Sequence, residues 1–131
     1  MKKLFVIVLS FVSISLFGGE IDSRFFKAMH VVETGGRFGS IKGDNGKALG
    51  PLQIHKAYWS DAVAHDKSIG GKYEDCAGYS YSVKVVKAYL NRYCKGGTYE
   101  QMARCHNSGP AWRKKYHLTN GYWRKFEKSL K

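Results

Sequence analysis

The chain of 131 residues carries 22 lysines and arginines against 10 acidic residues, giving a formal charge of +12, and 44% of its residues are hydrophobic. This length holds one ordinary domain and little else, and the apolar content is ample for a packed core, which argues against a disordered chain. The cations are scattered, without the block of about five or six expected of a nucleic-acid-binding tail, so we expect no nucleic-acid partner.

The first 19 residues have the layout of a secretory signal peptide: two lysines, an apolar run over residues 4–17 and the small pair Gly18-Gly19. The run is too short for a comfortable membrane span, and the alternative is an uncleaved anchor or a buried N-terminal helix. Cleavage after Gly19 would remove two lysines and no acid, leaving one domain over residues 20–131 with a formal charge of +10. We expect a secreted or periplasmic monomer, without stable membrane insertion, whose basic surface docks on an anionic cell wall.

Helical spacing of apolar residues predicts a first helix over residues 21–34, with Asp22 or Ser23 as its N-cap and Gly35-Gly36 as its stop. The stretch that follows, up to residue 54, is rich in glycine and lacks a helical period. Within it, Asp44-Asn45-Gly46 has the chemistry of a tight hairpin turn. We therefore expect a small β-region or irregular lobe after the first helix.

The sequence predicts further helices over residues 56–65 and 80–93. In the second, one face carries the apolar residues Val85, Val86, Tyr89, Leu90 and Tyr93. Thr98 and Gln101 form a capping box that starts a helix running to about Cys105, and the Asn-Ser-Gly-Pro stretch at 107–110 must break it. A last helical segment covers residues 119–130. Together these elements predict an α+β fold that is mostly α. We expect one domain, because no repeat or linker-like stretch divides the chain.

Three cysteines, Cys76, Cys94 and Cys105, fit an oxidising compartment and predict one disulfide and one free thiol. The interval between Cys76 and Cys94 is mostly helical, at about 1.5 Å per residue, which holds those two too far apart to bridge. The pair therefore includes Cys105, and its partner stays open. Alternatively, one of the cysteines could be a catalytic nucleophile, but the sequence shows no recognisable His/Asn pair to act with it.

Glu33 is the leading candidate for acid chemistry. It lies at the C-terminal end of its predicted helix, where the macrodipole disfavours an anion, and its neighbours Met29, Val31 and Val32 suggest partial desolvation. Both effects favour the protonated form that a general acid requires. The alternative is an ordinary solvated glutamate at a helix end.

Asp44 lies eleven residues further on, where a hairpin could bring it back to face the end of that helix. Hydrolysis of a glycosidic bond needs two carboxylates of unlike environment, one protonated and one ionised, and Glu33 and Asp44 could supply them. Asp before Asn-Gly is also an ordinary turn residue. The histidines and cysteines show no metal-ligand spacing, and no phosphate-binding loop or serine elbow is present, so we expect no metal and no cofactor.

Three blocks in order resemble the motifs of lysozyme-like proteins, most closely invertebrate-type lysozymes: V-E-T-G at 32–35, G-D-N-G-K-A-L-G-P-L-Q-I at 43–54, and A-R-C-H-N-S-G-P at 103–110. Tyr58-Trp59 and Tyr122-Trp123 fill the family's aromatic positions. The resemblance runs from about residue 25 to 126 and implies a lysozyme-like fold with a small β-hairpin lobe. It also implies a glycoside hydrolase (lysozyme, muramidase) that cleaves the β-1,4 linkage between N-acetylmuramic acid and N-acetylglucosamine in peptidoglycan.

By this resemblance Glu33 matches the catalytic acid and Asp44 the second carboxylate, while Gln53, His106 and Asn107 match residues that line the cleft or hold its wall. Clefts that bind sugars use flat aromatics and amides, which makes Tyr58, Gln53 and Asn107 the preferred substrate contacts. Trp59 is expected to be buried rather than to face the ligand.

The chain departs from invertebrate-type lysozymes in having few cysteines, so its stability must rest on packing. Lytic transglycosylases share a similar motif skeleton and cleave the same bond with a lone glutamate, forming an anhydro sugar. The presence of Asp44 favours hydrolysis over that alternative. A third possibility, from a different class, is a non-catalytic cationic antimicrobial or wall-binding protein that keeps the lysozyme shape.

Overall fold

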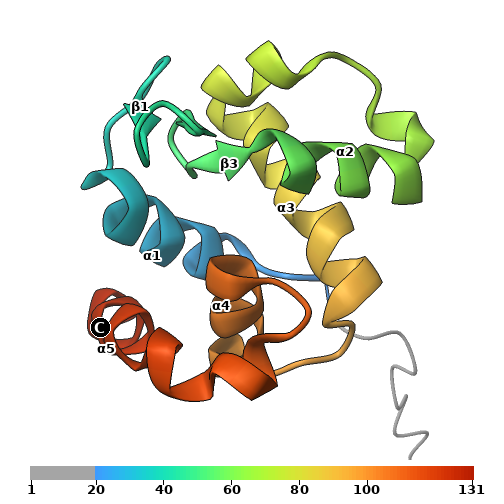
Figure 1. The fold of residues 1–131 in the computed structure, drawn as a ribbon. Helices are drawn as coiled ribbons and strands as arrows, with labels where there is room; N and C mark the ends of the chain where they lie inside the picture. Colours follow the sequence, from blue (N-terminus) through green and yellow to red (C-terminus); the bar gives the residue numbers. More distant parts are fainter. Residues whose placement is uncertain (1–19) are drawn as a thin grey trace, which may run out of the picture.

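The structure is a computed structural model that describes residues 20–131, and the predicted signal peptide over residues 1–19 lies outside them. The described part of the chain contains no helix long and apolar enough to cross a membrane. In chain order the elements are α1 (Ser23–Thr34), β1 (Lys42–Gly43), β2 (Ala48–Leu49), β3 (Ile54–His55), α2 (Lys56–His65), η1 (Lys67–Ile69), η2 (Tyr73–Ala77), α3 (Tyr79–Tyr93), α4 (Tyr99–Ser108), η3 (Trp112–Thr119) and α5 (Asn120–Ser129) (Figure 1).

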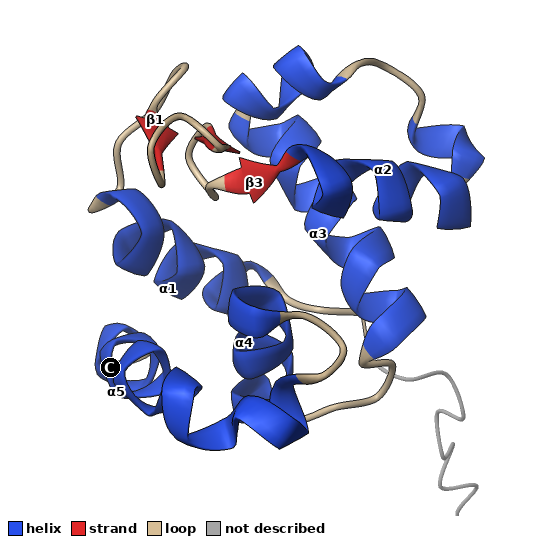
Figure 2. Cartoon of the chain, in the orientation of Figure 1, coloured by secondary structure: helices blue, strands red, loops and turns tan. Residues whose placement is uncertain are grey.

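The α+β prediction, mostly α with one small β lobe, is confirmed (Figure 2). The three strands form an antiparallel sheet in the order β1-β2-β3, with Gly43 opposite Ala48 and Ala48 opposite His55. In Figure 1 the sheet and α2 lie on one side of α1, and α4 and α5 lie on the other. The end of α1 therefore stands between the β lobe and the C-terminal helices.

Helix α1 begins and ends where its local chemistry dictates. Asp22 caps it by accepting hydrogen bonds from the N–H groups of Arg24 and Phe25, which places the start two residues later than the predicted residue 21. Gly35 ends it in the left-handed conformation, with φ 64°, and its N–H donates to the carbonyl of Val31 at 2.8 Å. The helix buries Phe25 and Met29 in the core and carries Glu33 in its last turn.

One hydrophobic core joins the elements. Fully buried side chains come from all five α-helices and from the β lobe, and the largest apolar ones are Phe25, Met29, Leu52, Ile54, Val85, Val86, Leu90 and Phe126. The predicted apolar face of α3 is thus mostly confirmed, with Tyr93 at its end only partly buried. Helix α3 packs against α2 and η2 on one side and against α4 on the other, so it joins the two sides of the core.

The predicted end of the helix after Thr98 is wrong by about one turn. The capping box of Thr98 and Gln101 is present, but the helix continues to Ser108 instead of stopping near Cys105. The chain leaves the helix at Gly109, which has φ 85° and donates its N–H to the carbonyl of Cys105. As a result His106 and Asn107 lie on α4, a rigid element, rather than in a loop.

Sequence periodicity also misses η3, a kinked 3₁₀ segment that leads into α5. The buried Arg104 of α4, 3% exposed, holds this segment by donating from Nη1 to the carbonyl of Tyr116, to Oγ1 of Thr119 and to Oδ1 of Asn120 at 2.8–2.9 Å. These bonds fix the first residues of α5 against α4.

The three thiols are free in the described residues, and the Cys94 and Cys105 thiols lie close enough to affect each other's pKa. Helix α3 runs between Cys76 and Cys94, as the argument against that pair requires. A disulfide that includes Cys105 stays a prediction, and the structure offers Cys94 as its partner.

Candidate active site

Glu33 is partly buried and receives hydrogen bonds from two other helices. Its side chain is 16% exposed. The hydroxyl of Tyr122 in α5 donates a hydrogen bond to Oε1 at 2.8 Å, and Nε2 of His106 in α4 lies 3.2 Å from the same oxygen. The carboxyl group is thus held between the C-terminal helices and the end of α1.

His106 is in turn held by Tyr58 of α2, whose hydroxyl lies 2.9 Å from Nδ1. The Tyr58 ring stacks on Tyr89, with centroids 3.6 Å apart and planes at 13°. Burial raises the pKa values of Tyr58 and Tyr122 well above the usual range, and the nearby Glu33 carboxylate adds to this. Both hydroxyls therefore keep their protons at any physiological pH and remain hydrogen-bond donors.

Asp44 occupies the predicted hairpin turn. Asp44 and Asn45 have φ values of 49° and 55°, and the N–H of Gly46 donates to the carbonyl of Gly43 at 3.0 Å, as in a type I′ turn. The Asp44 side chain is 61% exposed, with Oδ2 3.2 Å from Nε2 of His55 at the end of β3. The two carboxyl groups are therefore in different environments. Asp44 contacts solvent and His55, whereas Glu33 is mostly buried.

A depression of about 350 Å³ brings these residues together. It is lined by Glu33, Asp44, Ala48, Gln53, His55, Tyr58, His106 and Asn107. All six residues named from the sequence thus lie around one site, although they come from α1, the β lobe, α2 and α4. Asn107 is exposed at its edge, which leaves its amide accessible to a ligand.

Gln53 holds the wall of the β lobe. Its backbone has φ 53°, and its Nε2 donates to the carbonyls of Ile41 and Gly50 at 3.2 and 2.9 Å. Its Oε1 lies where a Cβ on residue 43 would collide with it, so a larger residue in place of Gly43 would displace the Gln53 amide. Trp59 lies outside the lining of the depression and donates its indole N–H to the Tyr81 hydroxyl at 2.9 Å.

Sequence reasoning missed two residues of the site. His55 follows the Q-I pair directly, but its contact with Asp44 depends on the register that sets Ala48 opposite His55. In the sequence Tyr122 stands out only as part of an aromatic pair with Trp123. Its 89-residue separation from Glu33 leaves no local signal for their hydrogen bond.

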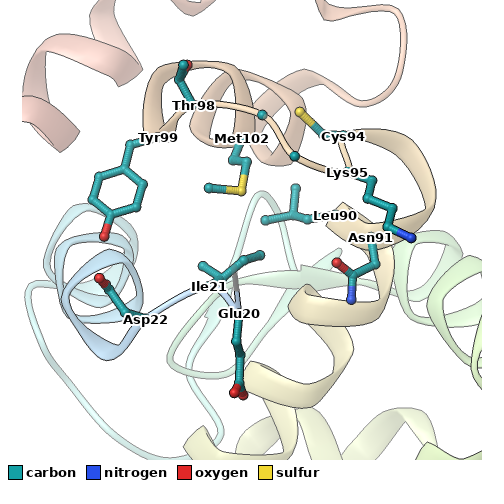
Figure 3. A pocket seen from close by; sticks show the side chains of 12 residues that line it. Glu20, Ile21, Asp22, Leu90, Asn91, Cys94, Lys95, Thr98, Tyr99 and Met102 are labelled. Carbon is teal, nitrogen blue, oxygen red and sulfur yellow. The ribbon is translucent and has the colours of Figure 1, made fainter. Parts of the chain in front are cut away.

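A second pocket, of about 310 Å³, lies between the residues before α1 and the α3–α4 junction (Figure 3). Its two carboxylates have structural partners. A hydrogen bond from Lys87 lowers the pKa of Glu20, and one from Tyr99, whose hydroxyl points at Asp22 in Figure 3, lowers the pKa of Asp22. Both are held ionised, which is the opposite of what a general acid needs, so this pocket does not rival the first.

Comparison with known proteins gives a family from the sequence and similar lysozymes from the structure. The profile of the family described as Destabilase matches residues 23–129. Among solved structures, the chain is similar to Tapes japonica lysozyme, with 28% identity and a TM-score of 0.70 over 84% of this chain and 91% of that one. It is also similar to an inhibitor-bound lysozyme from Meretrix lusoria, with 32% identity and a TM-score of 0.69 over the same shares. A structure of Aeromonas hydrophila PliI in complex with Meretrix lusoria lysozyme matches equally well, with 32% identity and a TM-score of 0.69. The chain therefore belongs to the Destabilase family.

Proposed function

We propose that this protein is a lysozyme-type glycosidase that hydrolyses the β-1,4 linkage between N-acetylmuramic acid and N-acetylglucosamine in peptidoglycan. One observation carries the proposal: Glu33 and Asp44, from separate elements, line a single depression in unlike surroundings. Membership of the Destabilase family and similarity to lysozymes from Tapes japonica and Meretrix lusoria support the same activity.

In this mechanism Glu33 is the acid and Asp44 the second carboxylate. The enclosed Glu33 protonates the leaving glycosidic oxygen, so that the bond to the anomeric carbon breaks. The exposed Asp44 carboxylate either attacks that carbon or stabilises the oxocarbenium-like centre. No metal or cofactor enters the scheme.

The remaining residues of the depression divide into contacts and supports. Asn107 is the one whose amide is exposed, so we assign it a direct hydrogen bond to a sugar. Gln53 and Tyr58 contribute polar and aromatic edges while their other bonds keep the β lobe and His106 in place. His106 contacts the acid itself.

Charge supports docking of an exported form on the wall. Residues 20–131 carry a formal charge of +10, and the exposed η3 segment contributes Arg113, Lys114 and Lys115 in a row. Long-range attraction of this kind concentrates a basic enzyme on an anionic polymer. An exported protein, secreted or periplasmic, meets that polymer.

The test of the acid is Glu33→Gln, which keeps the shape of the side chain and removes the transferable proton. We expect lysis of purified peptidoglycan to fall by about 1000-fold or more, as for loss of an essential acid. Glu127→Gln, an exposed glutamate of α5 outside the depression, is the matched control and should retain full activity. Wild-type activity in Glu33→Gln would show that the acid is assigned wrongly.

Mass spectrometry of the digested wall separates the two reactions. Hydrolysis adds water and leaves reducing ends, whereas a lytic transglycosylase leaves anhydro ends. We expect reducing ends, because Asp44 stands beside the acid in the same depression. Killing of cells that persists in Glu33→Gln, without release of sugar fragments, would instead favour a non-catalytic cationic protein.

A further inference from the structure

Both hydrogen bonds to Glu33 arrive at one oxygen. Tyr122 and His106 approach Oε1 from α5 and α4, at 2.8 and 3.2 Å. Within residues 20–131 no hydrogen bond reaches Oε2. The two oxygens of the carboxyl group are therefore in different environments, and the difference is built by side chains from three helices.

The direction of each hydrogen bond follows from the groups involved. Tyr122 keeps its proton and donates it to Oε1. The Tyr58 hydroxyl also keeps its proton, and among the described residues its hydrogen-bond partner is Nδ1 of His106. A buried hydroxyl without an acceptor is costly, so Tyr58 donates to Nδ1. His106 is then neutral, with its proton on Nε2, and donates to Glu33 Oε1.

An oxygen that accepts two hydrogen bonds is a poor place for a proton, because a hydroxyl there would face two donors. We propose that Tyr122 is a positioning residue that, together with His106, directs the transferable proton of Glu33 to Oε2. This inference rests on the proposed function. During the reaction the proton leaves Oε2 for the glycosidic oxygen, and the negative charge that remains is stabilised at Oε1 by both donors.

The fold keeps Tyr122 in place for this role. Arg104, buried in α4, donates to Thr119 and Asn120 immediately before it. The Tyr122 ring packs 6.2 Å from Phe126 and 6.3 Å from His106, centroid to centroid. A donor set on a fixed helix loses little entropy when it meets the charge that develops on the acid.

Tyr122→Phe tests the inference, since it removes the hydroxyl and keeps the ring. We expect kcat on soluble peptidoglycan fragments to fall about 10- to 100-fold with KM unchanged, because the lost bond acts on the acid and not on substrate binding. Loss of a donor to the carboxylate also favours its protonated form, so the basic limb of the pH–kcat profile should move to higher pH. The substitution removes none of the other titratable side chains around the acid, which are Tyr58, His106, Asp44 and His55.

Tyr93→Phe is the matched control. Tyr93 also donates its hydroxyl to a carboxylate, Oδ2 of Asp61 at 3.1 Å, but outside the depression. The Tyr93→Phe variant should have the same kcat and the same pH–kcat profile as the wild type. If Tyr122→Phe behaves like Tyr93→Phe, or loses activity with no movement of the basic limb, the inference is wrong.

Glu33→Gln separates this inference from the function on which it rests. An active Glu33→Gln overturns the assignment of the acid, whereas an inactive Glu33→Gln beside an unaffected Tyr122→Phe overturns only the role of Tyr122. A second measurement needs no variant. Nitrogen NMR of the wild-type His106 imidazole should report the neutral tautomer protonated at Nε2, and a proton on Nδ1 alone would contradict the proposed direction of the bonds.

Discussion

Asp44 and His55 meet across the β lobe, with the carboxylate Oδ2 3.2 Å from the imidazole Nε2. Both side chains are about half exposed or more, so the pair adds little to stability. The pair orients the carboxylate: Asp44, in the turn between β1 and β2, is held by His55 at the end of β3. The β lobe thus sets where the second carboxylate of the depression points.

Asp44→Asn should separate the chemical role of this carboxylate from its role in the turn. Asparagine also favours the left-handed conformation that position 44 adopts, with φ 49°, so we expect the hairpin and the melting temperature to be retained. Activity on peptidoglycan should fall about 100-fold or more, because the ionised partner of the acid is lost. Full activity of Asp44→Asn beside an inactive Glu33→Gln would favour the transglycosylase reaction.

Local signals in the sequence predict much of this fold. The helix over 56–65 has the bounds of α2, and the Asp44-Asn45-Gly46 turn and the capping box of Thr98 and Gln101 are confirmed. Each depends on residues only a few positions apart, whose hydrogen bonds are made within the segment. The sequence therefore carries enough information for these elements without knowledge of their packing.

The hydrogen bonds of the candidate site depend instead on tertiary contacts. Nothing near Tyr122 in the sequence indicates that its hydroxyl reaches Glu33, because that contact depends on η3, which has no apolar period, and on Arg104. The extension of α4 to Ser108 has a local cause instead, since the helix ends only at Gly109, which has φ 85°. The convergence of Glu33 and Asp44 could be expected from the sequence, whereas the hydrogen bonds to the acid could not.

Arg104→Ala should destabilise the protein strongly. The guanidinium is 3% exposed, donates to three acceptors of η3 and α5 from Nη1 alone, and lies 3.8 Å from the Tyr116 ring centroid. Its removal leaves Thr119 Oγ1 and Asn120 Oδ1 without this donor, whereas the Tyr116 carbonyl keeps the hydrogen bond from the Thr119 hydroxyl. We expect a cost of about 3 to 5 kcal/mol in the free energy of unfolding. Denaturant unfolding checks this, with the exposed Arg113→Ala as the control. Equal stability of the two variants would contradict this role of Arg104.

Oxidised protein should contain a disulfide between Cys94 and Cys105. The Cys94 and Cys105 thiols lie close enough to affect each other's pKa, whereas α3 separates Cys76 from Cys94. Burial raises the pKa of the Cys76 and Cys105 thiols alike, to about 12, so the position of the thiols and not their acidity distinguishes the two pairings. Peptide mapping without reductant, after exposure to glutathione disulfide, should link the Cys94 and Cys105 peptides and leave Cys76 free. A linked peptide that contains Cys76 would refute this pairing.

Lysis of whole cell walls should decrease as salt is added, whereas cleavage of short, soluble wall fragments should change little. The reason is the range of the attraction: the Debye length shortens from about 30 Å at 0.01 M salt to about 8 Å at 0.15 M, which screens the +10 charge of residues 20–131 from an extended anionic polymer. A short fragment is bound mainly by contacts in the depression, where Glu33 and its partners are already shielded from bulk ions. Replacing the exposed row Arg113, Lys114 and Lys115 with glutamine should flatten the salt response of wall lysis and leave fragment cleavage unchanged. Equal salt dependence for walls and fragments would place the effect in the depression and remove the case for docking by surface charge.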